Sequence, residues 1–386
     1  MIIGFDASRA FIKERTGTEN YSYQLLLALS KIDRINQYII YLRPFISDAA
    51  VPLMKFPKNF KLVRIPWLRL WTQGGLAIET FKDVLHQSKI DVLFIPAHTM
   101  PLLHRPGLKT VVAVHDLGSE YLPSMHQLKQ RLYLGFMQKY QLKNATKIIA
   151  VSKATKDDLV KRIGINPEKI EVVYEGYDRN LFKLTKINVK VSSLIPYFLF
   201  VGTIQPRKNL ARLIDAFARY SQSLGNIQSS KSLRSEDMNI SVAPSLLIVG
   251  SKGWLSDDIY TLPKVLGIED RVKFLGHVPD EKLPALYSGA EALLFPSLFE
   301  GFGLPLLEAQ ACGCPVLTSN VSSMPEVAGK SAILVNPESV DDIVRGMEKM
   351  EDGKSKMEII KKGFENIKRF SWEKCAKETL KVLENV

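Results

Sequence analysis

Residues 292–312, ALLFPSLFEGFGLPLLEAQAC, combine three kinds of local sequence. The apolar run 292–295 is typical of a buried strand, and Pro296 ends it. A segment with two glycines follows, and Pro305 then suits the first position of a helix that would continue to Cys312. A buried strand, a loop and a helix in this order form the repeating unit of a parallel α/β sheet.

The same alternation occurs in both halves of the 386-residue chain. It predicts strands at residues 1–6, 38–42, 61–65, 91–95, 110–114, 147–151 and 170–174, and then at 197–201, 246–250, 271–275, 292–295, 315–318 and 332–335. Because such nearly continuous apolar strands are buried on both faces, the pattern indicates parallel sheets covered by helices. Two such blocks predict two doubly wound α/β domains, residues 1–187 and 188–370, with a polar linker at 183–193.

Two other segments have different signals. Residues 222–244 are rich in Ser and Asn and lack apolar periodicity, so we expect a mobile surface insertion after a helix at 209–220. Residues 371–386 predict a C-terminal helix with Ser371 as its N-cap.

Composition limits the class of protein. No apolar run of about 18 residues predicts a transmembrane helix, and the N-terminal residues predict a strand instead of a signal peptide. The spacing of the three cysteines suits small buried thiols better than a disulfide framework or a zinc site.

The charge of the chain is unevenly distributed. Residues 1–190 carry 29 Lys and Arg against 16 Asp and Glu, a net charge of +13, whereas the whole chain has +12. This asymmetry suggests that the first domain faces an anionic ligand or surface, and nucleic acid and anionic lipid are both candidates. A basic protein from a basic proteome explains the charge equally well.

In open parallel sheets, ligands bind beyond the carboxyl ends of the strands, so the loops there are the candidate sites. After the first strand of the second half, Gly202 permits close backbone approach, and Arg207 and Lys208 place two cations at the start of a helix that Asn209 can cap. The helix dipole disfavours cations there unless an anion also binds, so the two residues indicate a diphosphate site. The strand-end turn 276–280 is a candidate contact to a nucleobase.

Glu300 and Glu308 enclose a segment whose backbone amides are bare. We predict Glu300 in a loop and Glu308 in the first turn of the following helix. Amides donate hydrogen bonds and carboxylates accept them, so the combination suits a polyhydroxylated ligand better than a phosphate alone.

These segments resemble the retaining GT-B glycosyltransferases of family 4 (group 1), in particular their mannosyltransferase-like members. The resemblance rests on the Glu-x7-Glu motif 300–308, the Arg-Lys-Asn segment 207–209, the turn 276–280, the Arg-Thr-Gly-Thr loop 15–18, the His-Asp-Leu segment 115–117 and the segment 174–178. Within the last of these, Glu175 stands where Asn is more usual. The resemblance implies two Rossmann-like domains facing across a cleft, with helix 371–386 crossing back to the first.

The resemblance also implies roles for individual residues. The catalytic residues would be His115, Asp116, Arg207, Lys208 and Glu300. The donor-binding residues would be Gly17, Gly202, Arg207, Lys208, Gly276, His277, Val278, Glu300, Phe302, Gly303, Leu304 and Glu308. Among them, Arg207 and Lys208 would hold the donor diphosphate, Glu300 the transferred sugar and Glu308 the ribose hydroxyls, while His115 would lie near the donor sugar.

The implied function is transfer of a hexose from a nucleotide-sugar, with GDP-mannose as the first candidate donor, to a saccharide or lipid-linked saccharide in cell-envelope polysaccharide synthesis. The chain contains no Asp-x-Asp motif, so we expect neither a metal nor a cofactor. We expect a cytoplasmic protein, peripheral to the inner face of the plasma membrane, with no nucleic-acid partner. The segment 67–71 and a basic helix at 128–142 suit contact with anionic lipid, although ordinary helix packing explains them as well.

Other functions remain open at this stage. A GT-B-like sugar-nucleotide epimerase would share the fold, and a non-enzymatic nucleic-acid or polyanion binder would use the basic half. A nicotinamide dehydrogenase needs Gly-x-Gly-x-x-Gly after its first strand, and the segment 301–303 lacks the third glycine.

Overall fold

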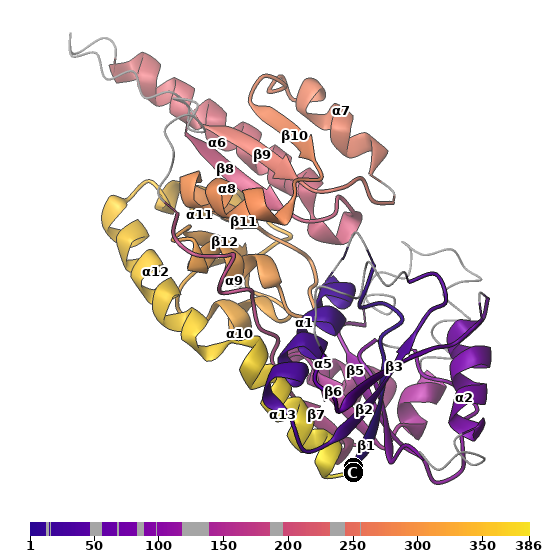
Figure 1. Ribbon diagram of the computed structural model, residues 1–386. Helices are drawn as coiled ribbons and strands as arrows, with labels where there is room; N and C mark the ends of the chain where they lie inside the picture. The colour runs from indigo at the N-terminus through magenta and orange to yellow at the C-terminus, as the bar shows by residue number, and fades with distance from the viewer. Residues whose placement is uncertain are drawn as a thin grey trace. The chain divides into compact units, whose positions relative to one another are not determined.

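The computed structural model describes residues 1–12, 15, 17–46, 56–67, 69–82, 89–97, 99–117, 139–185, 196–231, 244–254 and 256–386. These residues divide into two compact units (Figure 1). The first unit comprises Met1–Gly176 and Phe370–Val386, and the second comprises Tyr177–Arg369.

The described part of the first unit contains a parallel sheet with the strand order β3-β2-β1-β4-β5-β6-β7. Its strands are β1 (Ile2–Asp6), β2 (Gln37–Leu42), β3 (Phe60–Arg64), β4 (Val92–Ile95), β5 (Lys109–Val114), β6 (Lys147–Ala150) and β7 (Ile170–Val172). Its helical segments are α1 (Gly17–Ile32), η1 (Trp71–Leu76), α2 (Ala77–Lys82), α5 (Lys153–Asp158), η3 (Leu159–Ile163), η4 (Pro167–Lys169) and α13 (Trp372–Glu384). The central strands are buried because Val, Ile, Leu and Phe occupy both of their faces.

The second unit has a parallel sheet with the order β10-β9-β8-β11-β12-β13 among its described residues. Its strands are β8 (Tyr197–Val201), β9 (Ser245–Val249), β10 (Val272–Gly276), β11 (Ala292–Phe295), β12 (Val316–Ser319) and β13 (Ile333–Val335). Its helical segments are η5 (Pro206–Lys208), α6 (Leu210–Lys231), α7 (Asp257–Val265), η6 (Asp280–Lys282), α8 (Leu283–Gly289), α9 (Leu304–Ala311), α10 (Met324–Ala328), α11 (Val340–Lys349), α12 (Gly353–Asn366) and η7 (Ile367–Arg369).

The strands predicted from the sequence are all present, with ends displaced by at most two residues. Cys312, Cys314 and Cys375 are buried free thiols, as their spacing suggested. Within the described ranges, no helix is both long and apolar enough to cross a membrane.

One predicted segment is wrong in part. Helix α6 continues to Lys231, so residues 222–231, which we expected in a mobile insertion, are helical. This stretch contains no proline, and its backbone can therefore continue the i→i−4 hydrogen bonds. Residues 232–243 of the predicted insertion and residues 128–138 of the predicted basic helix lie outside the described residues.

The predicted boundary after residue 187 is also displaced, because the second unit already begins at Tyr177. Phe182 packs edge-on against Tyr287 with ring centroids 6.1 Å apart, and the hydroxyl of Thr185 lies 3.1 Å from that of Ser288. These side-chain contacts tie the start of the predicted linker and the residue before it to helix α8. Polar composition alone did not reveal them.

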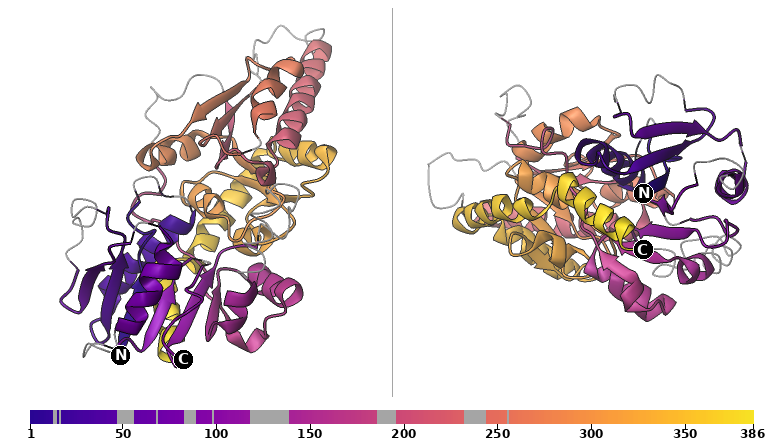
Figure 2. Two further views of the ribbon diagram at one scale, coloured as in Figure 1. Left: turned by 90° about the vertical axis from the view of Figure 1, so that its right-hand side faces the viewer. Right: turned by 60° about the horizontal axis from the view of Figure 1, so that its bottom comes forward.

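The chain leaves the first unit after Gly176 and re-enters it at Phe370. These two points lie side by side in that unit. The rings of Tyr174 and Phe370 lie 5.7 Å apart, and the backbone of Gly176 packs against the start of α13. The termini lie close together at the other end of α13, because the side chain of Asn36 hydrogen-bonds both the N-terminal amine and Glu384 (Figure 2). Helix α13 packs against α1 and completes this unit.

We predict that Gly176→Ala destabilises the first unit by about 3 kcal/mol, the upper end of the cost of overpacking. A Cβ atom there would lie 2.1 Å from the backbone nitrogen of Trp372, which cannot move without displacing α13. Urea denaturation measures the change. Gly353→Ala is the matched control, because a Cβ there meets nothing within 4 Å, and equal stability of the two variants would contradict the contact.

Candidate functional site

The carboxyl edge of the second sheet is bare backbone at three neighbouring strand ends. Gly202, Gly250 and Gly276 stand at the ends of β8, β9 and β10. The amide of Gly202 donates to Val249 at 2.9 Å, and that of Gly250 donates to Gly276 at 2.8 Å. A Cβ at Gly250 would lie 2.0 Å from the carbonyl oxygen of Gly202, so only glycine fits. The glycine at 250 is therefore required by the close approach of these two strand ends to each other.

Arg207 and Lys208 belong to the short turn η5 that follows this edge and precedes α6. We expected the side chain of Asn209 to cap α6, but it does not. Its backbone is left-handed, with φ 61°, and its side-chain amide donates to the carbonyls of Pro296 at 3.0 Å and Pro337 at 2.6 Å. Asn209 thereby joins three loops at the edge of the sheet.

Glu300 contacts both cations of η5. Its Oε2 accepts a hydrogen bond from Arg207 at 2.6 Å, and its Oε1 accepts one from the ammonium of Lys208 at 2.6 Å. Glu300 is 6% exposed and Lys208 is 7% exposed, so these are buried ion pairs. Burial raises the pKa of Glu300, but the charges of Arg207 and Lys208 outweigh it and lower that pKa to about 2.

The loop that carries Glu300 is fixed by two serines that follow β12. The hydroxyls of Ser322 and Ser323 donate to the carbonyl of Glu300 at 2.6 and 2.9 Å, and Ser323 also bonds the carbonyl of Phe302 at 2.8 Å. Gly303, with φ 105°, then opens α9. The N–H groups in the first turn of a helix have no acceptor inside it, so the start of α9 can donate to a ligand.

Glu308 lies one residue farther along its helix than we predicted. Since α9 starts at Leu304, Glu308 stands in its second turn, half-buried, and accepts a hydrogen bond from the hydroxyl of Tyr287 at 2.9 Å. Burial raises the pKa of Glu308 to about 7, although the bond from Tyr287 opposes this shift and Asp280 adds to it. The two carboxyls of the motif thus differ in charge near neutral pH.

The structure brings the predicted second-unit residues to one edge but places three others in the first unit. Gly17 is the exposed first residue of α1. His115 and Asp116 follow β5, where His115 is 7% exposed and Asp116 is half-buried. In the loop after β10, His277 is exposed and Val278 is half-buried.

Comparison with known proteins identifies the family. Residues 15–181 match the model of Glycosyltransferase Family 4, and residues 191–366 match that of Glycosyl transferases group 1. The chain belongs to this glycosyltransferase family. Its two parallel, Rossmann-like sheets form the GT-B fold.

Two curated relatives of this glycosyltransferase are bacterial. The O-antigen chain mannosyltransferase B of Escherichia coli is 28% identical over 282 residues, which cover 70% of this chain and 69% of the relative. The O-antigen chain mannosyltransferase RfbU of Salmonella typhimurium is 30% identical over 279 residues, with the same coverage. Among solved structures, Anabaena HepE in complex with UDP-glucose has a TM-score of 0.70 at 19% identity and covers 100% of both chains, a likeness of fold.

Sequence reasoning missed several residues of the glycosyltransferase that support the motif residues. Ser322 and Ser323 lie four and five residues after the predicted strand 315–318, in the loop at its carboxyl end, and that position was a usable signal. Tyr287 and the bridging role of Asn209 had no local signal, because their partners are distant in sequence.

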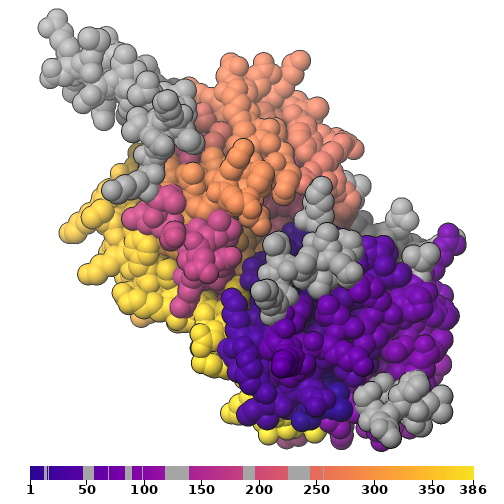
Figure 3. Space-filling model, viewed as in Figure 1, coloured from indigo at the N-terminus to yellow at the C-terminus, as the bar shows by residue number. Residues whose placement is uncertain are grey.

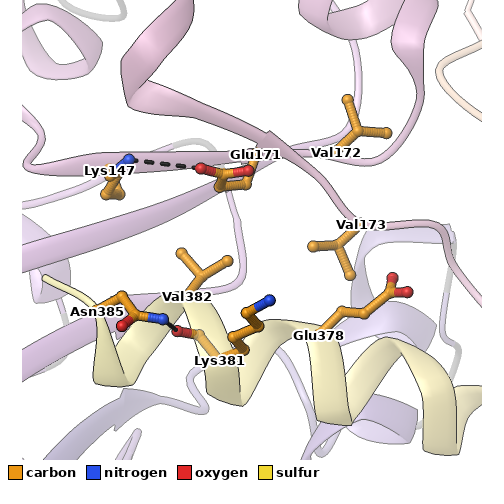
Figure 4. A pocket seen from close by; sticks show the side chains of 8 residues that line it. All are labelled: Lys147, Glu171, Val172, Val173, Glu378, Lys381, Val382 and Asn385. Atoms are coloured by element: carbon orange, nitrogen blue, oxygen red, sulfur yellow. Dashed lines mark hydrogen bonds and ion pairs between the residues drawn. The ribbon is translucent and has the colours of Figure 1, made fainter.

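A separate pocket of about 310 Å³ lies between β6, β7 and the end of α13 (Figure 4). Lys147, the first residue of β6, lines it and pairs with Glu171 at 3.4 Å. The pocket is therefore at the amino end of that strand, away from the carboxyl edge at which parallel sheets bind ligands. Among the described residues, no group of three or more His, Cys, Asp or Glu could hold a metal ion.

We predict that Glu300→Gln lowers the free energy of unfolding by about 3 kcal/mol at pH 7. A pKa lowered from 4.5 to about 2 means that the ionised form is stabilised by folding. This contribution to stability is complete above pH 4.5 and is lost as the pH falls through about 2. The difference in free energy of unfolding between wild type and Glu300→Gln should therefore be about half as large at pH 3 as at pH 7.

Urea denaturation at both pH values measures the effect. Glu338→Gln is the control, because Glu338 is an exposed carboxylate of the same unit. A difference between Glu300→Gln and the wild type that does not change with pH would contradict the ion-pair account.

Proposed function

We propose that this glycosyltransferase transfers mannose from GDP-mannose to a saccharide or lipid-linked saccharide acceptor in cell-envelope polysaccharide synthesis. Two O-antigen mannosyltransferases among its relatives support the sugar and the pathway class. The observation that carries the proposal is the buried cluster of Arg207, Lys208 and Glu300 at the carboxyl edge of the second sheet.

The proposed chemistry uses this cluster at the leaving group. In sugar transfer, the bond from the anomeric carbon to the diphosphate breaks, and the diphosphate keeps the electron pair. The acceptor hydroxyl forms the new bond and releases its proton. Arg207 and Lys208 would bind the diphosphate, and cations already held in place stabilise its developing charge without reorganisation. This role supports a metal-independent reaction.

Glu300 would exchange partners when the donor binds. A diphosphate that reaches Arg207 and Lys208 competes with the carboxylate for the same cations. Glu300 could then accept hydrogen bonds from the hydroxyls of the sugar, and Glu308 could accept bonds from the ribose. Retention of the anomeric configuration is part of the proposal and follows the resemblance to retaining members of the family.

A donor screen tests the function. Because a ligand that binds the native state raises the melting temperature, we expect GDP-mannose to give a larger thermal shift than UDP-glucose or ADP-glucose. Lys208→Ala should abolish that shift and reduce acceptor-dependent release of GDP by at least about 100-fold. Chelation of divalent metals should leave the rate unchanged.

Arg219→Ala is the matched control for this screen, because Arg219 is an exposed cation on α6 that pairs with Asp215. Normal turnover in Lys208→Ala would overturn the assignment of the cluster. A larger shift with UDP-glucose would overturn the choice of GDP, and GDP release that does not require an acceptor would overturn group transfer.

We also propose that the first unit contacts an anionic lipid surface through the segment before and within α2, which lies at the outer side of this unit (Figure 3). The ring of Trp67 packs over Gly74, where a Cβ would lie 2.7 Å from it. Ile78 and Phe81 follow on the same helical face, 41% and 43% exposed. Trp71 of the predicted segment is buried and takes no part.

The charges around this apolar stripe favour lipid over a neutral partner. Arg64 and Arg69 are exposed in the segment before α2, Lys82 ends α2 and pairs with Glu79 at 3.3 Å, and residues 1–190 carry a net charge of +13. An apolar face bordered by cations is the pattern that binds anionic headgroups and inserts shallowly into the interface.

We expect the protein to co-sediment with vesicles that contain phosphatidylserine and to bind less well as salt increases. Ile78→Ser combined with Phe81→Ser should weaken binding by at least about 30-fold, since each buried apolar side chain contributes roughly 1 kcal/mol or more. Val265→Ser, at an exposed apolar residue of the second unit, is the control. Absence of binding at low salt, or equal binding by the double variant, would contradict the surface.

A further inference from the structure

A second buried ion pair lies in the first unit, at the ends of three strands. His115 follows β5, Pro96 follows β4, and Glu175 follows β7. Nδ1 of His115 lies 3.1 Å from a carboxylate oxygen of Glu175, and Nε2 lies 2.9 Å from the carbonyl oxygen of Pro96. His115 is 7% exposed and Glu175 is 4% exposed.

Both neighbours of the ring are oxygen acceptors. A carbonyl oxygen can only accept a hydrogen bond, so Nε2 carries a proton. An ionised carboxylate also only accepts, so Nδ1 facing Glu175 carries a proton too. A ring protonated on both nitrogens is an imidazolium, and its hydrogen bond to a buried carboxylate is strengthened by charge.

The groups around the ring together favour the charged form of His115. Burial lowers the pKa of His115, but the hydrogen bond and charge of Glu175, the carbonyl of Pro96 and the charge of Asp116 together raise it above its ordinary value. The ring of Tyr21 meets the imidazole edge-on at 4.5 Å.

The ion pair is also connected to both passages of the chain between the units. Glu175 directly precedes Gly176, whose backbone packs against Trp372 at the start of α13. Tyr21 closes a ring of contacts, because it packs against Trp372 at 5.8 Å as well as against His115. Orientation of the His115 ring is therefore coupled to the segments at which the chain leaves and re-enters this unit.

We propose that Glu175 is a positioning residue that keeps His115 protonated on both ring nitrogens and fixes the ring between β4 and β7. The proposal rests on the proposed function and on the place near the donor sugar that the family resemblance implies for His115.

Glu175→Gln removes the charge of residue 175 while nearly keeping the size and shape of its side chain. The glutamine amide can donate to Nδ1 of a neutral imidazole while Nε2 still donates to Pro96, so the geometry survives without the proton. In the wild type, the pKa of His115 is raised, so the ion pair stabilises the protein fully below about pH 6.5 and loses this contribution as the pH rises through the raised pKa.

The test combines a spectroscopic and a kinetic measurement on the full chain. NMR of histidine-labelled protein, with His115→Gln to assign the signal, follows the ring against pH. We expect the midpoint to fall by at least about one pH unit in Glu175→Gln, because burial then acts without the carboxylate. In the pH profile of kcat/KM for transfer, the apparent pKa of the alkaline limb should fall by the same amount. Glu171→Gln, which removes a more exposed carboxylate on β7, should change neither.

Each outcome decides the proposal. A His115 signal that is neutral in the wild type at pH 6, or a midpoint unchanged in Glu175→Gln, overturns the charged ring. A shifted midpoint with an unchanged kinetic limb overturns the role in transfer. Wild-type protein without any transferase activity would refute the proposed function instead, while the NMR measurement would still decide the charge of the ring.

Discussion

The candidate donor site depends on the contact of one carboxylate with two cations. Glu300 and Lys208 are buried, and a charge removed from water is costly unless an opposite charge lies beside it. The loop after β11 and the turn after β8 must therefore stay together, although their residues are far apart in sequence. Asn209 and the two serines after β12 fix the same loops from the backbone side. Glu300, Lys208 and Asn209 thus each have hydrogen-bond partners within the site.

Both units contain a buried ion pair of a glutamate, but the partners of the two glutamates differ. Each has a buried glutamate beside cationic side chains at the carboxyl edge of a parallel sheet. Arginine and lysine keep their charge throughout the physiological range, so the charges that face Glu300 do not change with pH. The partner of Glu175 is a histidine, whose charge depends on its surroundings and on pH. The fold thus combines one electrostatic contact whose cations keep their charge with one that protons can modify.

The sequence predicted the features that depend on local pattern. Runs such as 197–201 and 292–295 specify buried strands by composition alone, and the spacing of Glu300 and Glu308 indicated one ligand surface. Features set by distant contacts were missed, since Tyr287 beside Glu308 and Glu175 beside His115 require the folded chain. The same reason explains the displaced boundary, because the segment from Tyr177 to Thr185 is polar in part yet packs on α8. The extra length of α6 escaped prediction because Ser and Asn weaken helical signals without forbidding a helix.

The second unit is inserted between the two parts of the first. Helix α13, which packs against α1 and contributes Trp372 beside Tyr21, follows the whole second unit along the chain. Tyr177–Arg369 can form its own core before that helix is synthesised, whereas the first unit cannot close its packing until α13 has been added. During synthesis, the unit that starts first is therefore completed after the second unit, and the face of α1 that α13 covers stays exposed until then.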